Sequence, residues 1–431
     1  MEKRKNLLVG TLGLVLLLTS CGQSSASPTP TEIGPEPTAT TEPTATPRET
    51  ENPGLDAQET LTSIQATGTN LMKTKRAEET IQSTDETDDE PDDSIPAMAY
   101  IGPDDNVWVL ETGGQTPRQI TFDANRTGGD RAEVVYLNPL LSSDGTLLVY
   151  YMDVGTPSAN GHAYTHGVWV ANLITGEHRQ ILEGRFSGMA WKPGTHLLAY
   201  GHEVDMDYSI SRGESDTVRP KGIHTIDMDN GEIHYLVAPE RGYALSSPNW
   251  SPDGRFLAFS ESVSMETGMF AYYDLENQEY VAWDEYVGRA SWSPDGSLLT
   301  YDRIYYVPTG EERLYLRPRQ GDEQLLGPDY DGPAYASQPV FSPAGDQIAY
   351  LARLEGPETD FATIMVLDLA GGEPKSLGQF EDVWEFSWVP DGSHLVFSFG
   401  LYPSRHIIAL NISDGSQTML AAGDQLTLAG Q

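Results

Sequence analysis

The sequence of 431 residues contains a single cysteine, Cys21. A chain with one cysteine forms no internal disulfide, so its fold depends on side-chain burial and backbone hydrogen bonds. Basic residues are also scarce, with 26 lysines and arginines against 64 aspartates and glutamates. The formal net charge of −38 argues against a nucleic-acid partner and against binding along an anionic lipid surface. It permits basic partners and divalent cations, although acidity also serves simply to keep a domain soluble.

Long apolar runs are lacking too. The run from Leu7 to Leu18 is too short to span a bilayer, but it suits the core of a secretory signal, and basic residues precede it at positions 3–5. It ends in Leu18-Thr19-Ser20-Cys21, which resembles the lipobox of bacterial lipoproteins. The resemblance implies that residues 1–20 are a lipoprotein signal peptide and that acyl chains such as palmitate on Cys21 anchor the protein in a membrane. An ordinary signal peptide is the alternative.

Residues 21–96 have the composition of a linker. The stretch 27–49 consists largely of proline, threonine and glutamate, and the stretch 83–93 is an acidic run. Neither offers enough apolar surface to form a core, and proline and repelling charges extend a chain. We therefore predict a disordered, lipid-anchored stalk over residues 21–96, with the folded part of the chain at 97–431.

One ten-residue phrase recurs six times in the remaining chain, at intervals of 42 to 59 residues. Its copies are LSSDGTLLVY (141–150), WKPGTHLLAY (191–200), WSPDGRFLAF (250–259), WSPDGSLLTY (292–301), FSPAGDQIAY (341–350) and WVPDGSHLVF (388–397). Each begins with a large apolar residue, continues through a turn that contains glycine, and closes with an apolar run that ends in an aromatic residue. Intervals of this length are typical of propeller blades.

The phrase has the features of a tight hairpin between the first two strands of a blade. Proline and glycine reverse the chain, and the apolar run indicates a central strand buried on both faces. A third strand and a short fourth strand follow, as at 167–173 and 179–182. The sequence therefore predicts an all-β fold, a β-propeller of four-stranded blades in which the first residue of each phrase packs between neighbouring sheets.

The ends of this region predict how the ring closes. Residues 97–121 offer three strands of a blade without its first strand, and residues 424–430 offer a spare strand after the sixth unit. If the spare strand pairs beside residues 97–102, neither end of the chain leaves an open sheet edge. This arrangement gives seven blades. Six blades with an appended terminal sheet are the alternative.

The W-S-P-D-G phrases at 250–254 and 292–296, each followed by an apolar strand, resemble the WD40-like repeats of the TolB propeller family. Such repeats also occur in the propeller of prolyl-oligopeptidase-type enzymes. The resemblance covers residues 97–431 and implies protein–protein contact at the cell envelope, as TolB makes with a peptidoglycan-associated lipoprotein. Two features depart from these families: a predicted anchor and stalk stand in place of the α/β domain of TolB, and the G-x-S-x-G motif of a hydrolase does not occur.

Two long connections on one face of the predicted propeller, at 152–166 and 202–221, are the candidate binding region, because long loops on a rigid scaffold commonly carry function. The candidate residues on them are His162, Tyr164, His166, His202, Asp205, Asp207, Tyr208 and Arg212. Histidines and aspartates from adjacent blades are ligands suited to a divalent metal, as in lyase propellers, and packing within the loops is the alternative.

These observations lead to three hypotheses for function. The first is a non-enzymatic, lipid-anchored adaptor of the bacterial cell envelope, outside the cytoplasm, that binds an envelope protein or a cell-wall component. It is expected to be a monomer and to need no cofactor and no nucleic acid. The second is a metal-dependent lyase or hydrolase with its site among the long loops, and the third is a surface spacer without a specific ligand. No catalytic residue is assigned.

Overall fold

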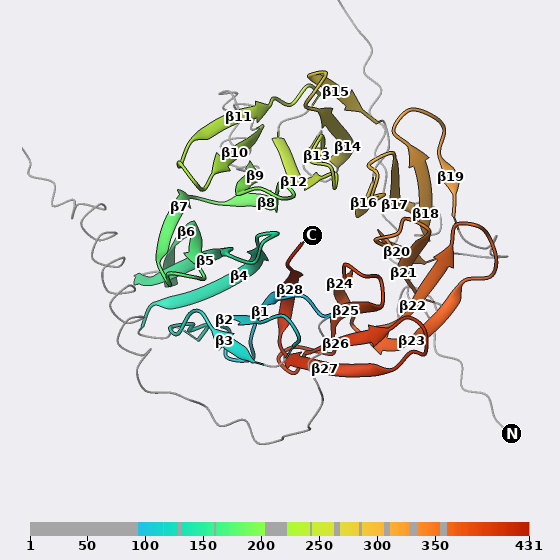
Figure 1. Cartoon of the computed structure of the whole chain (residues 1–431). Helices are drawn as coiled ribbons and strands as arrows, with labels where there is room; N and C mark the ends of the chain where they lie inside the picture. The colour runs from blue at the N-terminus through green and yellow to red at the C-terminus, as the bar shows by residue number, and fades with distance from the viewer. Residues whose placement is uncertain are drawn as a thin grey trace, which may run out of the picture. The chain divides into compact units, whose positions relative to one another are not determined.

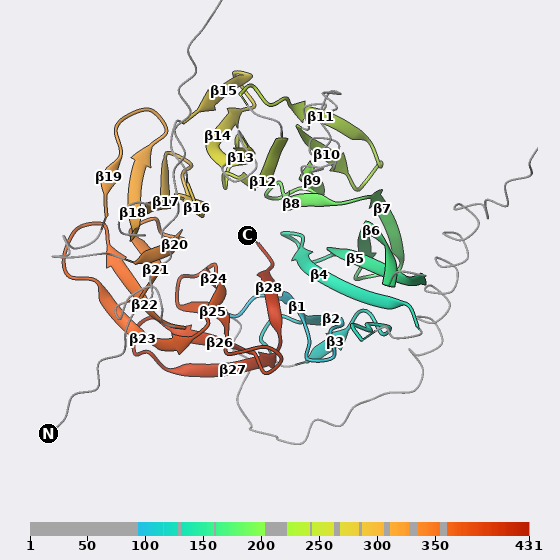
Figure 2. The same ribbon diagram turned by 180° about the vertical axis from the view of Figure 1, so that it is seen from behind.

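The computed structural model describes residues 94–114, 116–127, 131–158, 161–202, 222–241, 244–262, 268–283, 287–305, 311–326, 335–353 and 360–430. These residues form seven four-stranded antiparallel sheets, arranged in a ring as the blades of a propeller (Figures 1 and 2). The prediction of an all-β propeller with seven blades is confirmed, and the alternative of six blades is wrong. In the described part of the chain, no helix has the length and hydropathy needed to cross a bilayer.

Each blade has its first strand at the centre of the ring and its fourth strand at the rim. From the centre outward, blade 1 contains β28 (Asp424–Leu428), β1 (Met98–Ile101), β2 (Val107–Leu110) and β3 (Pro117–Gln119). Blade 2 contains β4 (Glu133–Leu141), β5 (Leu147–Ser158), β6 (Gly161–Asn172) and β7 (His178–Glu183). Blade 3 contains β8 (Phe186–Trp191), β9 (Leu197–His202), β10 (Ile223–Asp227) and β11 (Ile233–Val237). Blade 4 contains β12 (Ala244–Trp250), β13 (Phe256–Ser262), β14 (Gly268–Asp274) and β15 (Glu279–Ala282). Blade 5 contains β16 (Ala290–Trp292), β17 (Leu298–Tyr305), β18 (Glu311–Pro318) and β19 (Gln324–Leu325). Blade 6 contains β20 (Ala336–Phe341), β21 (Gln347–Ala352), β22 (Phe361–Asp368) and β23 (Lys375–Glu381). Blade 7 contains β24 (Trp384–Trp388), β25 (His394–Phe399), β26 (His406–Asn411) and β27 (Gln417–Ala422).

The ring closes in blade 1, where the last strand of the chain pairs with the first. In register, Met98 lies opposite Leu428 and Ala99 lies opposite Thr427. The backbone N–H of Ala429 also donates to the carbonyl of Ala97 at 2.8 Å. The predicted closure is therefore confirmed, and it removes the open sheet edge that each end would otherwise leave.

The repeated phrase forms the expected hairpin between the first and second strands of a blade. In blade 4, the N–H of Gly254 donates to the carbonyl of Ser251 at 2.8 Å, and Gly254 has a φ of +65°, which glycine adopts without strain. The Ser251 hydroxyl donates to Asp253 and accepts from the N–H of Phe256. Serine and aspartate therefore satisfy polar groups that the tight turn would otherwise leave without partners.

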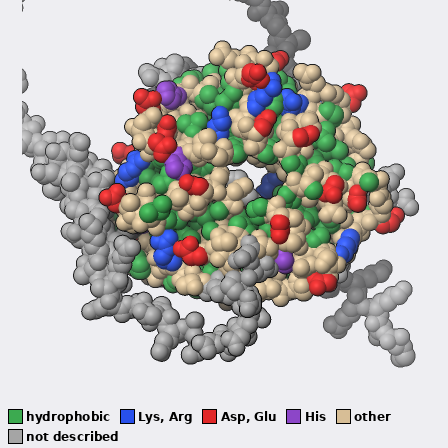
Figure 3. Space-filling view, in the orientation of Figure 1, with side chains coloured by type: hydrophobic (Ala, Val, Ile, Leu, Met, Phe, Trp, Pro, Cys, Tyr) green, Lys and Arg blue, Asp and Glu red, His purple; other side chains and the backbone are tan. Residues whose placement is uncertain are grey.

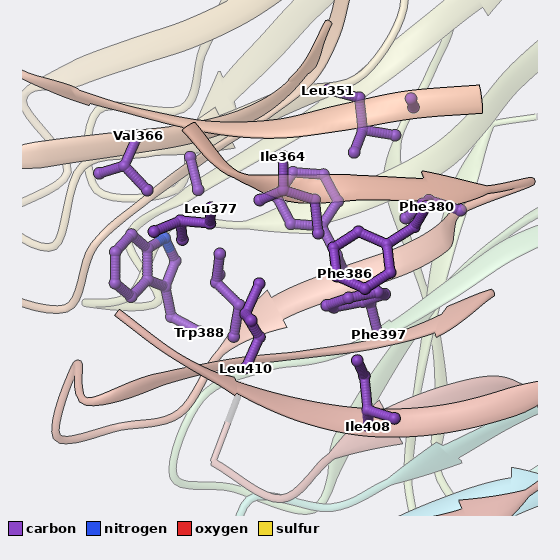
Figure 4. Close-up of a cluster of buried hydrophobic side chains, with 14 residues drawn as sticks. Leu351, Ile364, Val366, Leu377, Phe380, Phe386, Trp388, Phe397, Ile408 and Leu410 are labelled. Atoms are coloured by element: carbon purple, nitrogen blue, oxygen red, sulfur yellow. The ribbon is translucent and has the colours of Figure 1, made fainter. Parts of the chain in front are cut away.

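Three of the four tryptophans that open the phrase link their blade to the preceding one by a hydrogen bond. The indole N–H of Trp191 donates to the carbonyl of Leu140 at 3.1 Å, that of Trp292 donates to Asn249 at 3.3 Å, and that of Trp388 donates to Val340 at 3.2 Å. Apolar side chains fill the space around these bonds. Figure 4 shows the cluster between blades 6 and 7, where Ile364 and Leu377 of blade 6 meet Phe397 and Ile408 of blade 7. Burial between blades and hydrogen bonds thus hold the ring together without a disulfide.

Two faces of the ring follow from the strand order. The turn face carries the turns from first to second and from third to fourth strand, and the long-loop face carries the other connections. The described chain begins at the turn face, because the carbonyl of Ile95 accepts from the N–H of Gly113 in the turn between β2 and β3. It also ends there, at residues 429 and 430, after β28 has crossed from the long-loop face. The innermost strands surround a central opening that the space-filling view shows (Figure 3).

Most innermost strands are interrupted by one residue with a positive φ. These residues are Asn138, Gly188, Ser247, Gln338, Glu385 and Gln425. The pairing register shifts at the same points, as in a β-bulge. In blade 7 the bulge residue is the titratable Glu385, which therefore lies in strained backbone on the innermost strand.

Candidate functional site

The sequence predicted a long loop at 152–166, and this prediction is wrong. Strands β5 and β6 continue through this region as one hairpin, and their pairing extends to Ser158 opposite Gly161. His162, Tyr164 and His166 alternate along β6, so all three point to the same side of the hairpin. Their i, i+2, i+4 spacing is the period of a strand and is the sequence signal that could have revealed this arrangement.

His166 has a charged group close to each ring nitrogen, but only its Nε2 forms a hydrogen bond among the described residues. Its Nδ1 lies 2.8 Å from a carboxylate oxygen of Asp153, directly opposite on β5. Its Nε2 accepts a hydrogen bond of 2.9 Å from the Nε of Arg185. A neutral imidazole has one ring nitrogen with a free lone pair, and here that lone pair accepts from Arg185, whose guanidinium also repels a cation.

Tyr164 is the exposed member of this row, with 48% of its surface accessible. Its ring stacks on that of His166 with centroids 6.2 Å apart, and its hydroxyl donates to the carboxylate of Glu133. This hydrogen bond raises the pKa of Tyr164. Across the strand lies Gly155, where a Cβ atom would approach the Tyr164 ring to 2.7 Å, so the close approach of ring and backbone requires glycine.

The other predicted site residues are only partly described. The Nε2 of His162 is buried and has no hydrogen-bond partner among the described residues, and its ring lies 6.2 Å from that of Tyr164. His202 ends β9, where its backbone pairs with Phe186. Asp205, Asp207, Tyr208 and Arg212 lie outside the described residues. Within the described ranges, no group of three or more histidine, cysteine, aspartate or glutamate side chains is placed to hold a metal.

A second region, which no sequence pattern predicted, lies on the long-loop face between blades 6 and 7. It is a pocket of about 610 Å³, which we call the aromatic pocket. Its lining residues are Phe361, Gln379, Phe380, Glu381, Phe399, Gly400, Leu401, Tyr402, Ser404 and His406. Strands β22 and β23 of blade 6 form one wall, and the end of β25, the connection 400–405 and the start of β26 form the other.

Aromatic rings dominate this pocket. Phe399 lies between Phe380 and His406, with ring centroids 5.5 and 5.9 Å away. Phe380 is buried, whereas Phe361 is 44% and Tyr402 is 60% exposed. An apolar concavity of this size with a few polar groups is the usual form of a ligand site.

The connection 400–405 is fixed to both neighbouring blades. The N–H of Gly400 donates to the carbonyl of Glu381 in blade 6 at 2.8 Å. On the other side, the Tyr402 hydroxyl donates to Asp105 of blade 1 at 3.3 Å, and Arg126 lies 2.6 Å from Asp105 and above the Tyr402 ring. Contacts on both sides hold this wall of the pocket in place.

Arg405 fixes the residues that lie nearer the centre of the ring. Its guanidinium is 2.6 Å from Asp382 and 3.1 Å from Asp424, and it lies 5.1 Å from the ring centre of Trp384. Trp384 remains 40% exposed and donates its indole N–H to Asp382 at 2.8 Å. One guanidinium thus serves both carboxylates, which leaves the cluster with one excess negative charge, and the tryptophan extends the exposed aromatic surface.

A third concavity, of about 520 Å³, lies on the turn face between blades 2 and 3. In it, His196 lies 2.8 Å from Asp229 and 3.1 Å from Asp144 of the neighbouring blade. The hydrogen bond to Asp229, with that to Asp144, raises the pKa of His196. Partial burial opposes the ionisation of Asp144, but hydrogen bonds from Ser142 and Thr146 dominate and lower its pKa. The cluster therefore functions as an ion-paired link between two blades.

The fold defines the chain as a seven-bladed β-propeller, and several known proteins share this architecture. No protein-family model matches the sequence, and no curated protein matches it either. Among solved structures, a prolyl endopeptidase is similar with a TM-score of 0.54 and 14% identity, over 75% of this chain and 46% of that one. An oligogalacturonate lyase in complex with manganese is similar with a TM-score of 0.51 and 16% identity, over 70% of this chain and 84% of that one. TolB from Acinetobacter baumannii is similar with a TM-score of 0.46 and 14% identity, over 79% of this chain and 68% of that one. At these identities the likeness shows the fold alone.

Proposed function

We propose that this chain is a lipid-anchored propeller of the bacterial cell envelope that binds a protein partner through its long-loop face. One observation carries the proposal. Four exposed large apolar side chains, Phe361, Trp384, Leu401 and Tyr402, lie on the long-loop face at blades 6 and 7. Exposed aromatic and apolar residues gathered on one surface are typical of an interaction site.

The path of the chain supports this choice of face. Residues 94 and 95 enter the propeller at the turn face, so the predicted stalk joins the domain on the side opposite the aromatic pocket. Exposed large apolar residues elsewhere, such as Ile233 and Met419, lie mainly on the outermost strands.

Site-specific photo-crosslinking in cells tests the proposal. A photoreactive phenylalanine analogue at Tyr402 of the full chain is expected to give a discrete adduct with a partner. The same analogue at Ile174 on the turn face, or at Met419 on the outermost strand of blade 7, serves as a control, since both positions are exposed. Adducts at the control positions and none at Tyr402 would contradict the proposal.

The anchor needs a separate test. Replacement Cys21→Ser removes the only thiol and is expected to release the protein from membranes or leave an uncut precursor. Unchanged membrane retention would refute lipidation at this residue.

The hypothesis of a metal-dependent enzyme receives less support from the geometry. It depends on His162, His166 and His202, and the Nε2 of His166 already accepts a hydrogen bond from Arg185. Manganese is bound by an oligogalacturonate lyase of similar fold, but propellers of one fold serve many functions. Metal analysis of the purified full chain separates this hypothesis from the adaptor.

A further inference from the structure

Charge gives the first indication of what the aromatic pocket accepts. Residues 97–431 contain 47 acidic and 19 basic side chains. A surface of this composition attracts cationic groups and repels anionic ones.

Glu381 gives the second indication. This residue ends β23 and lines the pocket, where it lies directly across the strand pair from Phe361. Its carboxylate is partly buried and forms no hydrogen bond or ion pair with any residue in the described part of the chain. By contrast, the neighbouring carboxylate of Asp382 is paired with Arg405. A partly buried carboxylate without a counterion is a favourable position for a cation from outside the protein.

The aromatic rings give the third indication of what the pocket accepts. Phe361, Phe380, Phe399 and Tyr402 line the same pocket as Glu381. The faces of aromatic rings attract ammonium and guanidinium groups, and this attraction grows as water is excluded. Aromatic walls that meet one carboxylate therefore offer a cation both a charge partner and apolar contact for its alkyl stem.

We infer that the aromatic pocket binds the ammonium or guanidinium group of a lysine or arginine side chain, presented by a basic segment of a partner protein. The inference rests on the proposed function and specifies the chemistry of the partner. The alkyl stem of the cation lies against Phe380 and Phe399, and its charged end reaches Glu381. The volume of about 610 Å³ exceeds that of one such side chain, so residues of the partner on either side also enter.

A neutral sugar fits the pocket less well. Sugar rings stack on flat aromatic platforms, whereas Phe380 and Phe399 meet at an interplanar angle of 67° and form walls instead. A neutral sugar would also leave the carboxylate of Glu381 without a counterion.

The test uses the full chain purified in detergent and three defined probes. The first is a capped peptide with three lysines at alternate positions, the second is the same peptide with norleucine in place of lysine, and the third is chitotetraose. Binding is measured by fluorescence anisotropy for the peptides and by calorimetry for the sugar. The variants are Glu381→Gln, Phe361→Leu and, as a matched control, Glu373→Gln. Glu373 is an exposed residue on the turn face of the same blade, and its replacement changes the net charge equally.

We expect the lysine peptide to bind and the norleucine peptide not to bind. Glu381→Gln is expected to weaken binding by about tenfold and Phe361→Leu by about threefold, because one removes the charge partner and the other an aromatic face. Glu373→Gln should change the affinity by less than about twofold. Thermal melting of each variant confirms that the fold is kept.

Three outcomes would overturn the inference. Equal weakening by Glu381→Gln and Glu373→Gln would mean that the peptide binds through net charge alone. Binding of chitotetraose with no effect of Glu381→Gln would assign the pocket to a carbohydrate. Failure of the lysine peptide, with the photo-crosslink from Tyr402 intact, would leave the adaptor function standing and refute only the cationic chemistry.

Discussion

The stability of the ring is expected to depend on pH through Glu385. This residue has a φ of +44° on the innermost strand of blade 7, and its Oε2 is buried without a hydrogen-bond partner among the described residues. Burial, reinforced by the negative charge of Asp424, raises the pKa of Glu385 to about 7 from the ordinary 4.5. The charges of Arg289 and Arg405 and the N–H of Leu426 oppose this shift without cancelling it.

The sign of the effect follows from proton binding. Between pH 4.5 and about 7, the native protein holds a proton on Glu385 that the unfolded chain has released. The free energy of unfolding therefore falls as the pH rises through this window, and above it the ionised group destabilises the native state. One pKa unit corresponds to about 1.4 kcal/mol, so the shift sets an upper bound of about 3 kcal/mol.

The variant Glu385→Gln removes the titration while it keeps the shape of the side chain. It is expected to match the wild type near pH 5 and to exceed its stability at pH 8 by up to about 3 kcal/mol, or about 5 °C in melting temperature. Urea unfolding followed by tryptophan fluorescence at pH 5, 6, 7 and 8 measures the difference, with Glu373→Gln as the control. A difference between variant and wild type that stays constant from pH 5 to pH 8 would refute the reasoning.

Three further predictions concern the contacts between blades. His196→Gln should lower the free energy of unfolding by less than about 1 kcal/mol at pH 5.5 and by less still at pH 8.5. The reason is that the raised pKa of His196 gives stability that is present below the ordinary value of 6.5 and lost as the pH rises through the folded pKa. An equal loss at both pH values in urea titrations would count against the ion-paired link. Trp388→Phe should lower the free energy of unfolding by about 1–3 kcal/mol, since the carbonyl of Val340 loses its donor. Trp250→Phe should lower it by less, because the indole N–H of Trp250 has no partner among the described residues. Equal losses in urea unfolding would disprove the role of the Trp388 hydrogen bond. Leu428→Asp places a charge at a fully buried position of the closing strand β28 and should lower the free energy of unfolding by more than about 3 kcal/mol. Opening of the ring should be visible as aggregation in size-exclusion chromatography. A soluble monomer that melts at the wild-type temperature would refute closure through β28.

The fold was predictable from the sequence because its determinants are local and repeated. The turn around Gly254 and the tryptophan at position 250 lie within one ten-residue repeat. Its six copies all indicate the same structure, the hairpin between the first two strands of a propeller blade. The closing strand was predictable because residues 97–121 lack a first strand and 424–430 supply one. The prediction of a loop at 152–166 failed for a local reason as well, since the repeat frame indicates a long connection there, whereas the strand period of His162, Tyr164 and His166 indicates a continuing hairpin.

The aromatic pocket could not be predicted in the same way, because its residues come from two blades and several elements. Phe361 and Phe380 lie on the outer strands of blade 6, whereas Phe399 and Tyr402 belong to blade 7. On a strand of a propeller, an aromatic residue is usually part of the core, and Phe397 at 0% exposure follows that rule. Only the packing of one blade on the next determines that Phe361 and Tyr402 remain exposed, and no pattern within either segment encodes it.

The net negative charge of the domain and the contacts within the aromatic pocket act on a basic partner at different distances. Together they account for a surface that attracts basic proteins and selects among them. The net negative charge of residues 97–431 acts over about one Debye length, roughly 8 Å at physiological salt, and attracts any basic surface. It therefore governs how often a partner arrives. The carboxylate of Glu381 and the rings of Phe361 and Phe399 act only in contact, so they govern how long a partner stays. Added salt should accordingly slow the association of a basic partner, whereas Phe361→Leu should speed its dissociation. The two effects are separable in one kinetic experiment.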